Sequence, residues 1–175
     1  MEDTSISIIG IVIATILMFL VPFFLLADRN DDVSQLIAQT ATASFVDNIL
    51  KTGRITLDDY QKLVDDLNNS GVVFEVDMEV KVLDKNVSQL YTKNNNVIGN
   101  NEYYSLYTSQ IEDKLYNSSS EKVVLKEGDR VSVTVKNSGK TLSQTLKNIY
   151  YTVTGEELQI LVATGSGMVA VNGAS

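Results

Sequence analysis

Hydrophobic residues are concentrated in one segment near the amino terminus. From Ser5 to Ala27, 23 residues (SISIIGIVIATILMFLVPFFLLA) carry no formal charge, whereas residues 28–175 are polar and acidic and contain no second stretch of this kind. An α-helix of this length reaches about 34 Å at about 1.5 Å per residue, and a hydrocarbon core is about 30 Å thick. The pattern therefore predicts one membrane-spanning helix.

Two other identities for this segment compete with a membrane span. A cleavable secretory signal usually has Lys or Arg before its apolar stretch, whereas this chain starts Met-Glu-Asp-Thr and its apolar stretch is longer than such signals need. A helix buried in a soluble core is the other alternative, but a domain of this size rarely encloses 23 apolar residues on all sides. Membrane insertion is the favoured interpretation.

A second helical pattern follows the polar spacer Asp28 to Asp32 and is expected to continue the first helix. Apolar residues recur at spacings of three and four, at Val33, Leu36, Ile37, Ala41, Phe45 and Ile49. Gly53 is predicted to end this helix. Thr56, with Asp59 three residues later, predicts the N-cap of another helix, which Asn68-Asn69-Ser70-Gly71 would end.

Strands are predicted in the remaining part of the chain. Residues 72–83 alternate strictly, with the apolar side chains of Phe74, Val76, Met78, Val80 and Val82 on one face. Residues 123–125 and 131–135 predict a hairpin around the turn Glu127-Gly128-Asp129, and residues 158–163 predict a last strand.

Helices and loops complete the expected architecture. Residues 84–101 are rich in asparagine and predict a surface loop, residues 103–116 predict a short helix, and Thr141 is expected to cap a helix with Leu142, Leu146 and Ile149. The predicted fold is α+β: an amino-terminal hydrophobic and amphipathic helix over residues 1–52, followed by a globular head with antiparallel strands over residues 53–175.

Composition excludes several classes of function. The chain has 22 acidic and 14 basic residues and a net charge of −8, which argues against a nucleic-acid partner. It has neither cysteine nor histidine, which removes disulfides, the common zinc sites, haem ligation by these residues and Ser-His-Asp or Cys-His nucleophiles. No enzymatic activity and no cofactor are therefore predicted. A membrane-tethered hydrolase that uses paired carboxylates remains a third alternative without a supporting motif.

Orientation across the membrane rests on weak charge information. Arg29 is the nearest basic residue to the apolar segment, and it lies among Asp28, Asp31 and Asp32, so the rule of positive cytoplasmic flanks does not assign an orientation. A four-residue amino-terminal flank is easily left in the cytoplasm. The larger part of the chain is therefore expected outside the cell.

Three residues inside the apolar segment suggest helix–helix assembly. Gly10 and Ala14 form a small-xxx-small pair, which lets a second helix approach closely in lipid. Pro22 lacks a backbone donor and is expected to bend or loosen the helix. The alternative is that both features are ordinary, because membrane helices tolerate glycine and proline.

The acidic start, the long apolar helix with its proline, the amphipathic continuation and the late β-rich head together resemble the type IV filament superfamily of pilins, pseudopilins and Tad-type proteins. The resemblance implies that the apolar helix lies in the membrane until assembly and then packs with its copies in a filament core, with the head exposed on the cell surface. It also implies that Glu2 or Asp3 stands for the carboxylate that family members place near the mature amino terminus, where it neutralises a neighbour's α-amino group. No basic leader ending in glycine precedes the segment, so the expectation is either an already processed chain or no cleavage of the prepilin type.

A second resemblance involves the runs GDRVSVTVKNSGKTLSQTLKNIYY and LQILVATGSGMV. These runs look like small membrane-anchored proteins that accompany Tad-like or secretion machinery in low-GC Gram-positive bacteria. The leading hypothesis is accordingly a structural filament subunit that forms homo-oligomers and uses an assembly or secretion machinery. The alternative is a single-pass membrane-anchored accessory component of a secretion or conjugation apparatus.

The acidic pairs Asp58-Asp59 and Asp65-Asp66 are candidates for a calcium site. They lie seven residues apart on one predicted helical face, but the alternating oxygen ligands and central glycine of an EF-hand are missing. A solvated helix face is the favoured interpretation of these carboxylates.

Overall fold

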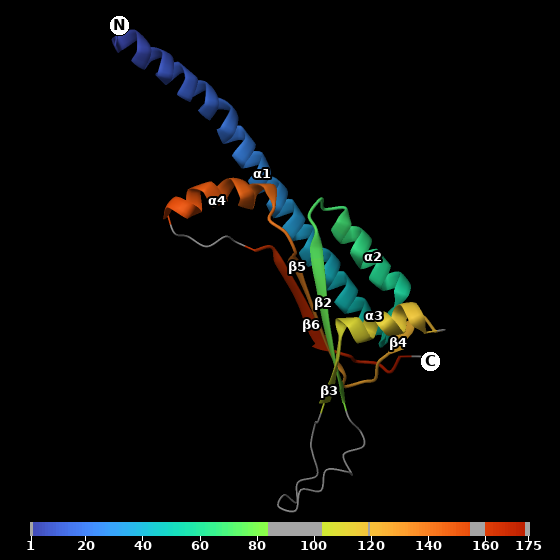
Figure 1. Cartoon of the computed structure of the whole chain (residues 1–175). Coiled ribbons are helices and arrows are strands. Elements are labelled where there is room, and N and C mark those ends of the chain that lie inside the picture. The colour runs from blue at the N-terminus through green and yellow to red at the C-terminus, as the bar shows by residue number, and fades with distance from the viewer. Residues whose placement is uncertain (1, 84–102, 119, 155–159, 174–175) are drawn as a thin grey trace, which may run out of the picture.

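A computed structural model describes residues 2–83, 103–118, 120–154 and 160–173, with side chains described over 4–83, 103–118, 120–148 and 160–173 (Figure 1). The chain has an α+β fold, as predicted. Helix α1, Glu2–Thr52, is 51 residues long, and its first half projects away from a small head that contains the strands. At about 1.5 Å per residue, α1 is about 76 Å long.

The head is built on an antiparallel sheet with the strand order β3-β2-β5-β6. These strands are β2 (Phe74–Leu83), β3 (Tyr103–Tyr107), β5 (Arg130–Asn137) and β6 (Val162–Met168). Met78 lies opposite Val133, and Val133 lies opposite Gly165, which fixes the register across three strands. A separate two-stranded sheet pairs β1 (Arg54–Thr56) with β4 (Lys122–Val124).

The described residues form three further helices. They are α2 (Leu57–Asn68), α3 (Thr108–Asn117) and α4 (Leu142–Thr154). The second half of α1 contacts β6, β5 and α2, whereas α4 meets α1 at the level where α1 leaves the head (Figure 1). The head therefore has a helical layer on one face of the sheet.

The core lies between the sheet and the second half of α1. From α1 it receives Ala38, Ala41, Phe45, Val46 and Ile49, and from the strands it receives Met78, Val80, Val131, Val133, Val135 and Ala163. A Cβ atom built on Gly165 would lie 2.9 Å from Val46 Cγ2, and one built on Gly167 would lie 2.4 Å from Leu50 Cδ1. Glycine at these positions of β6 is what lets α1 approach the sheet so closely.

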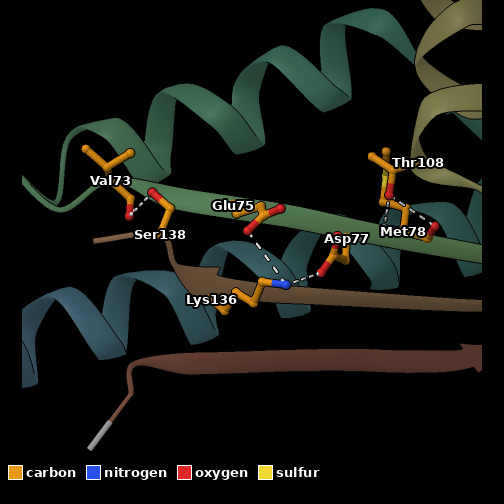
Figure 2. A network of polar contacts seen from close by, with 7 residues as sticks. All are labelled: Val73, Glu75, Asp77, Met78, Thr108, Lys136 and Ser138. Atoms are coloured by element: carbon orange, nitrogen blue, oxygen red, sulfur yellow. Dashed lines mark hydrogen bonds and ion pairs between the residues drawn. The ribbon is translucent and has the colours of Figure 1, made fainter. Parts of the chain in front are cut away.

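The opposite face of the sheet is polar, as the alternation in β2 predicts. Figure 2 shows Lys136 of β5 between two carboxylates of β2, with Nζ 2.8 Å from Asp77 Oδ2 and 3.6 Å from Glu75 Oε2. The hydrogen bond to Asp77 is the main reason that the pKa of Lys136 is raised. These charges pair on the solvent side, while the apolar side chains of β2 face the core on the other side of the sheet.

Several local predictions are confirmed. Gly53 ends α1 with φ +67°, and its N–H donates to Ile49 O at 2.8 Å. Thr56 caps α2, since its Oγ1 accepts from the Asp59 N–H at 3.2 Å. Gly71, with φ +76°, follows the end of α2 and leads toward β2.

Three predictions about the late elements are wrong. Residues 103–107 form β3 rather than the start of a helix, because pairing with β2 supplies their backbone partners and the helix begins only at Thr108. The expected hairpin is absent in the described residues, since β4 pairs with β1 and β5 pairs with β2 and β6. The last strand is Val162–Met168 rather than residues 158–163, because Gly165 and Gly167 lie within the sheet against α1.

Two predictions remain, one about a loop and one about the boundary between the helix and the head. The loop predicted over residues 84–101 lies outside the described residues. The predicted boundary after residue 52 coincides with the end of α1, although the helix from Ala38 to Ile49 contributes side chains to the core of the head.

Candidate functional site

The projecting half of α1 is an apolar surface that the rest of the described chain leaves uncovered. Its large side chains are strongly exposed, for example Ile6 at 67% and Met18 at 76%. The most apolar 18-residue window of the helix contains no buried residue, and by length and composition this helix is compatible with a single membrane span. An apolar surface of this size on a soluble protein marks a site of interaction with lipid or protein.

Gly10 and Ala14 lie on one face of this projecting half, one helical turn apart. Both are exposed, and a Cβ atom built on Gly10 would have no heavy atom within 4 Å. The space beside this face is therefore open to a second helix. Thr15 lies on another side, and its hydroxyl donates to Ile11 O at 2.8 Å within the helix.

Pro22 lies inside α1, and the helix continues without interruption on both sides of it. Proline has no backbone N–H to donate to the carbonyl four residues earlier, and the expected bending or loosening of the helix at Pro22 stays a prediction. Glu2 and Asp3 form the start of α1, but their side chains lie outside the described part of the structure. Their proposed charge pairing stays a prediction.

Polar contacts fasten α4 to α1 where the projecting half begins. Lys147 Nζ lies 2.6 Å from Asp28 Oδ1, and the Ser143 hydroxyl also donates to this carboxylate. Thr141 donates to Asp31 Oδ2 at 2.7 Å. The hydrogen bond from Lys147, followed by that from Ser143, holds the pKa of Asp28 below its ordinary value. Residues 28–32 are thus a docking point rather than a spacer.

The start of α4 is fixed by a reciprocal cap. The Gln144 N–H donates to Thr141 Oγ1 at 3.1 Å, and the Thr141 N–H donates to Gln144 Oε1 at 3.0 Å. The sequence identified Thr141 as a cap but gave no partner for Asp28 or Asp31. One combination in the sequence could have suggested these contacts. Asp28 and Asp31 follow the apolar segment, and the predicted start of a distant helix carries the hydroxyl groups of Thr141 and Ser143.

A shallow groove joins the projecting half to the head. It is lined by Phe23, Leu26, Ala27, Arg29, Asn30 and Val33 of α1 and by Leu142 of α4. Apolar side chains prevail in it, and Arg29 is its one charged residue. The apolar surface of α1 therefore continues beyond the charged residues that end the uncharged segment.

The acidic residues that were candidates for a calcium site gain no support from the described residues. The described residues contain no group of three or more acidic side chains placed to hold a metal ion. Asp59, one of the calcium candidates, instead accepts from the Thr56 hydroxyl at 2.6 Å.

Comparison with protein-family models, with curated proteins and with solved structures gives no match. The geometry of this chain combines a folded head with a long apolar helix whose surface is uncovered in the described residues.

Proposed function

We propose that this chain is a non-enzymatic structural subunit of an extracellular filament, in which the projecting halves of α1 pack together and the heads face outward. The observation that carries this proposal is an 18-residue apolar window with no buried residue, in a helix whose other half lies in the core of the head. The chain is expected to hold this helix in the membrane before assembly and to depend on an assembly or secretion machinery for its export. No nucleic acid takes part.

The energetics require a partner for this surface. Burying one Val, Leu, Ile or Phe side chain contributes about 1.5–3 kcal/mol, and many such side chains are exposed between Ile6 and Leu26. Lipid or copies of the same helix can both supply the contacts. The small residues Gly10 and Ala14 favour copies of the helix, since they permit close helix packing where lipid tails give no hydrophobic driving force.

The head is suited to stay folded while the projecting half changes its surroundings. Its core contains side chains from residues 38–49 of α1 and from the sheet, and of the uncharged segment only Ala27, its last residue, is buried. Transfer of that segment from lipid to a helical bundle therefore leaves the described core intact. This independence supports a subunit that is first membrane-bound and then polymerised.

The test is negative-stain electron microscopy of material sheared from the cell surface, with antibody labelling of this chain. Labelled filaments are expected for the natural chain. Gly10→Leu should abolish them, because a large side chain blocks close approach at the open face. The same substitution improves helix propensity by up to about 1 kcal/mol, so a weaker helix would not explain the loss.

Thr15→Leu is the matched control for Gly10→Leu. It adds a leucine to the same half of α1 but on another side of the helix, so filaments should persist. Circular dichroism of both variants in detergent checks that the heads remain folded. If the natural chain is found only in detergent-extracted membranes, the proposal is wrong and the membrane-anchored accessory component is favoured.

A further inference from the structure

An exposed stripe of α1 runs along the head and has no partner in the described residues. It begins in the groove beside Leu142 and consists of Arg29, Val33, Leu36, Thr40 and Ala43, which we call the α1 stripe. Val33 is 50% exposed and Leu36 is 63% exposed, although both belong to the half of the helix that packs on the sheet. These positions are alternately four and three residues apart, the spacing by which one helix packs along another.

The projecting half of α1 carries a second stripe with the same spacing. Asp3, Ser7, Gly10, Ala14 and Leu17 follow one another by four and three residues in the same order. A shift of 26 residues, the separation of Asp3 from Arg29, brings the two stripes into register. The resulting pairs are Asp3 with Arg29, Ser7 with Val33, Gly10 with Leu36, Ala14 with Thr40, and Leu17 with Ala43.

The sizes of these paired side chains are complementary. At this shift Gly10, beside which the structure leaves open space, would lie opposite Leu36, and the large Leu17 opposite the small Ala43. Such alternation of large and small residues allows two helices to interdigitate at close range. A shift of 26 residues therefore places a small residue opposite a large one in both of these pairs.

The charges at the start of the paired stripes are also complementary. Arg29 is the one basic side chain among residues 1–50 of the sequence, and within the described residues no ion pair is formed by its guanidinium. Glu2 and Asp3 are the acidic residues on the amino-terminal side of the apolar segment. An arginine in a largely apolar groove is stabilised by a carboxylate partner as the groove loses water.

We propose that the apolar segment of a second copy lies parallel to the α1 stripe, with Asp3 of that copy at Arg29. This inference rests on the proposed filament and adds its register. The two helices would be displaced by about 39 Å along their axes, since each residue adds about 1.5 Å. Contact between different surfaces of identical chains is heterologous, and repetition of such a contact generates an open helical polymer.

A disulfide test reads this register directly, because the chain contains no cysteine of its own. Ala14→Cys combined with Thr40→Cys places two cysteines opposite each other at the proposed offset. Oxidation of filaments from the full-length variant should give a ladder of covalent dimers, trimers and larger species on a non-reducing gel. Ser7→Cys combined with Val33→Cys tests the same offset one heptad earlier.

The matched control is Ala14→Cys combined with Asp47→Cys. Asp47 lies on the same side of α1 seven residues after Thr40, so its Cα is displaced by about 10 Å from the proposed register. A disulfide requires Cα atoms within about 7 Å, and the control should therefore give about tenfold less covalent dimer. Equal cross-linking of the two variants would overturn the proposed register.

The remaining outcomes separate the register from the function. Filaments of both paired-cysteine variants without cross-links would refute the register and leave the filament standing. Absence of filaments from the natural chain would refute both. If neither paired-cysteine variant assembles, a pair of charge-reversing substitutions tests the register. Arg29→Asp alone should reduce the yield of filaments, and the double variant with Asp3→Arg should restore it. Failure of the restored pair counts against the register.

Discussion

The two halves of α1 are both rich in apolar residues, but they distribute them differently. From Ser5 to Ala27 apolar side chains surround the helix, whereas from Ala38 to Ile49 they occupy the side that faces the sheet, and polar residues such as Gln39, Ser44 and Asp47 face solvent. An amphipathic helix is satisfied by one packing partner, but a helix that is apolar all round must be enclosed. The head supplies the single partner of the second half, whereas lipid or other helices must enclose the first half.

The largest expected difference between the two halves is in the loss of stability when an isoleucine is replaced by alanine. Ile49 is fully buried, so Ile49→Ala should lower the free energy of unfolding of the head by about 2–5 kcal/mol, through lost burial and a new cavity. Ile13→Ala makes the same change on the projecting half, where Ile13 is exposed. Urea unfolding followed by circular dichroism in a fixed detergent should show almost no change for this second variant.

The comparison would fail if Ile13→Ala destabilised the head as strongly as Ile49→Ala. Such a result would mean that the projecting half folds back on the head in solution. It would also contradict both proposals, because the surface needed for assembly would already be occupied within one chain.

A smaller difference in stability is expected when glycine is replaced by alanine at Gly167, which packs on the second half of α1, and at Gly10 within the first half. Gly167→Ala brings a Cβ atom against Leu50 Cδ1, at the end of a side chain that can shift in part, so the overpacking should destabilise the head by about 1 kcal/mol. Gly10→Ala meets no atom within 4 Å and should leave the unfolding of the head unchanged. Denaturation midpoints of the two variants, measured in the same detergent, give this comparison. A neutral Gly167→Ala would show that Leu50 moves aside without cost.

Much of this division was predictable from the sequence. The uncharged segment, the N-cap at Thr56, the helix end at Gly53 and the strict alternation of β2 are local patterns, and the structure contains each of them. The α+β class followed from their sum. Local periodicity is sufficient here because each pattern is long or ends in a residue with a specific backbone role.

Strand pairing and the helix contacts around Asp28 could not be predicted in the same way. β4 pairs with β1 across a long stretch of chain, and Tyr103 to Tyr107 become a strand because β2 offers an edge to them. The contact of Asp28 with Lys147 joins residues far apart in sequence. Such pairings depend on which elements meet in the folded chain, and propensity gives way to these contacts.

The exposed half of the candidate site was predicted more fully than its continuation into the head. Gly10, Ala14 and Pro22 were recognised from helix chemistry, and the structure places all three on the projecting half. Val33 and Leu36 belong to the same periodic pattern as the buried Ala41, Phe45 and Ile49. Their exposure depends on where the sheet and α2 end against α1, which the periodicity does not determine.

The smallest expected effect lies at the boundary between the two halves, where Lys147 contacts Asp28. Both side chains are more than a third exposed, so Asp28→Asn should weaken the docking of α4 by less than about 1 kcal/mol. Hydrogen exchange of the amides of residues 143–148 should increase, while exchange in β2 and β5 stays unchanged. Asp32→Asn is the matched control, because Asp32 is an exposed carboxylate one turn further along the same helix and forms no ion pair in the described residues.

The pH dependence of this contact has a definite sign. The pKa of Asp28 is lowered from its ordinary value of 3.8 in the folded chain, chiefly by the hydrogen bond from Lys147. The stabilisation is therefore fully present above that ordinary value and is lost as the pH falls through the lower pKa of the folded state. Exchange of the α4 amides, corrected for the intrinsic rate at each pH, should rise in the natural chain over this acidic interval but remain level in Asp28→Asn. If the two chains respond alike, the carboxylate of Asp28 does not hold α4 to the helix at this boundary.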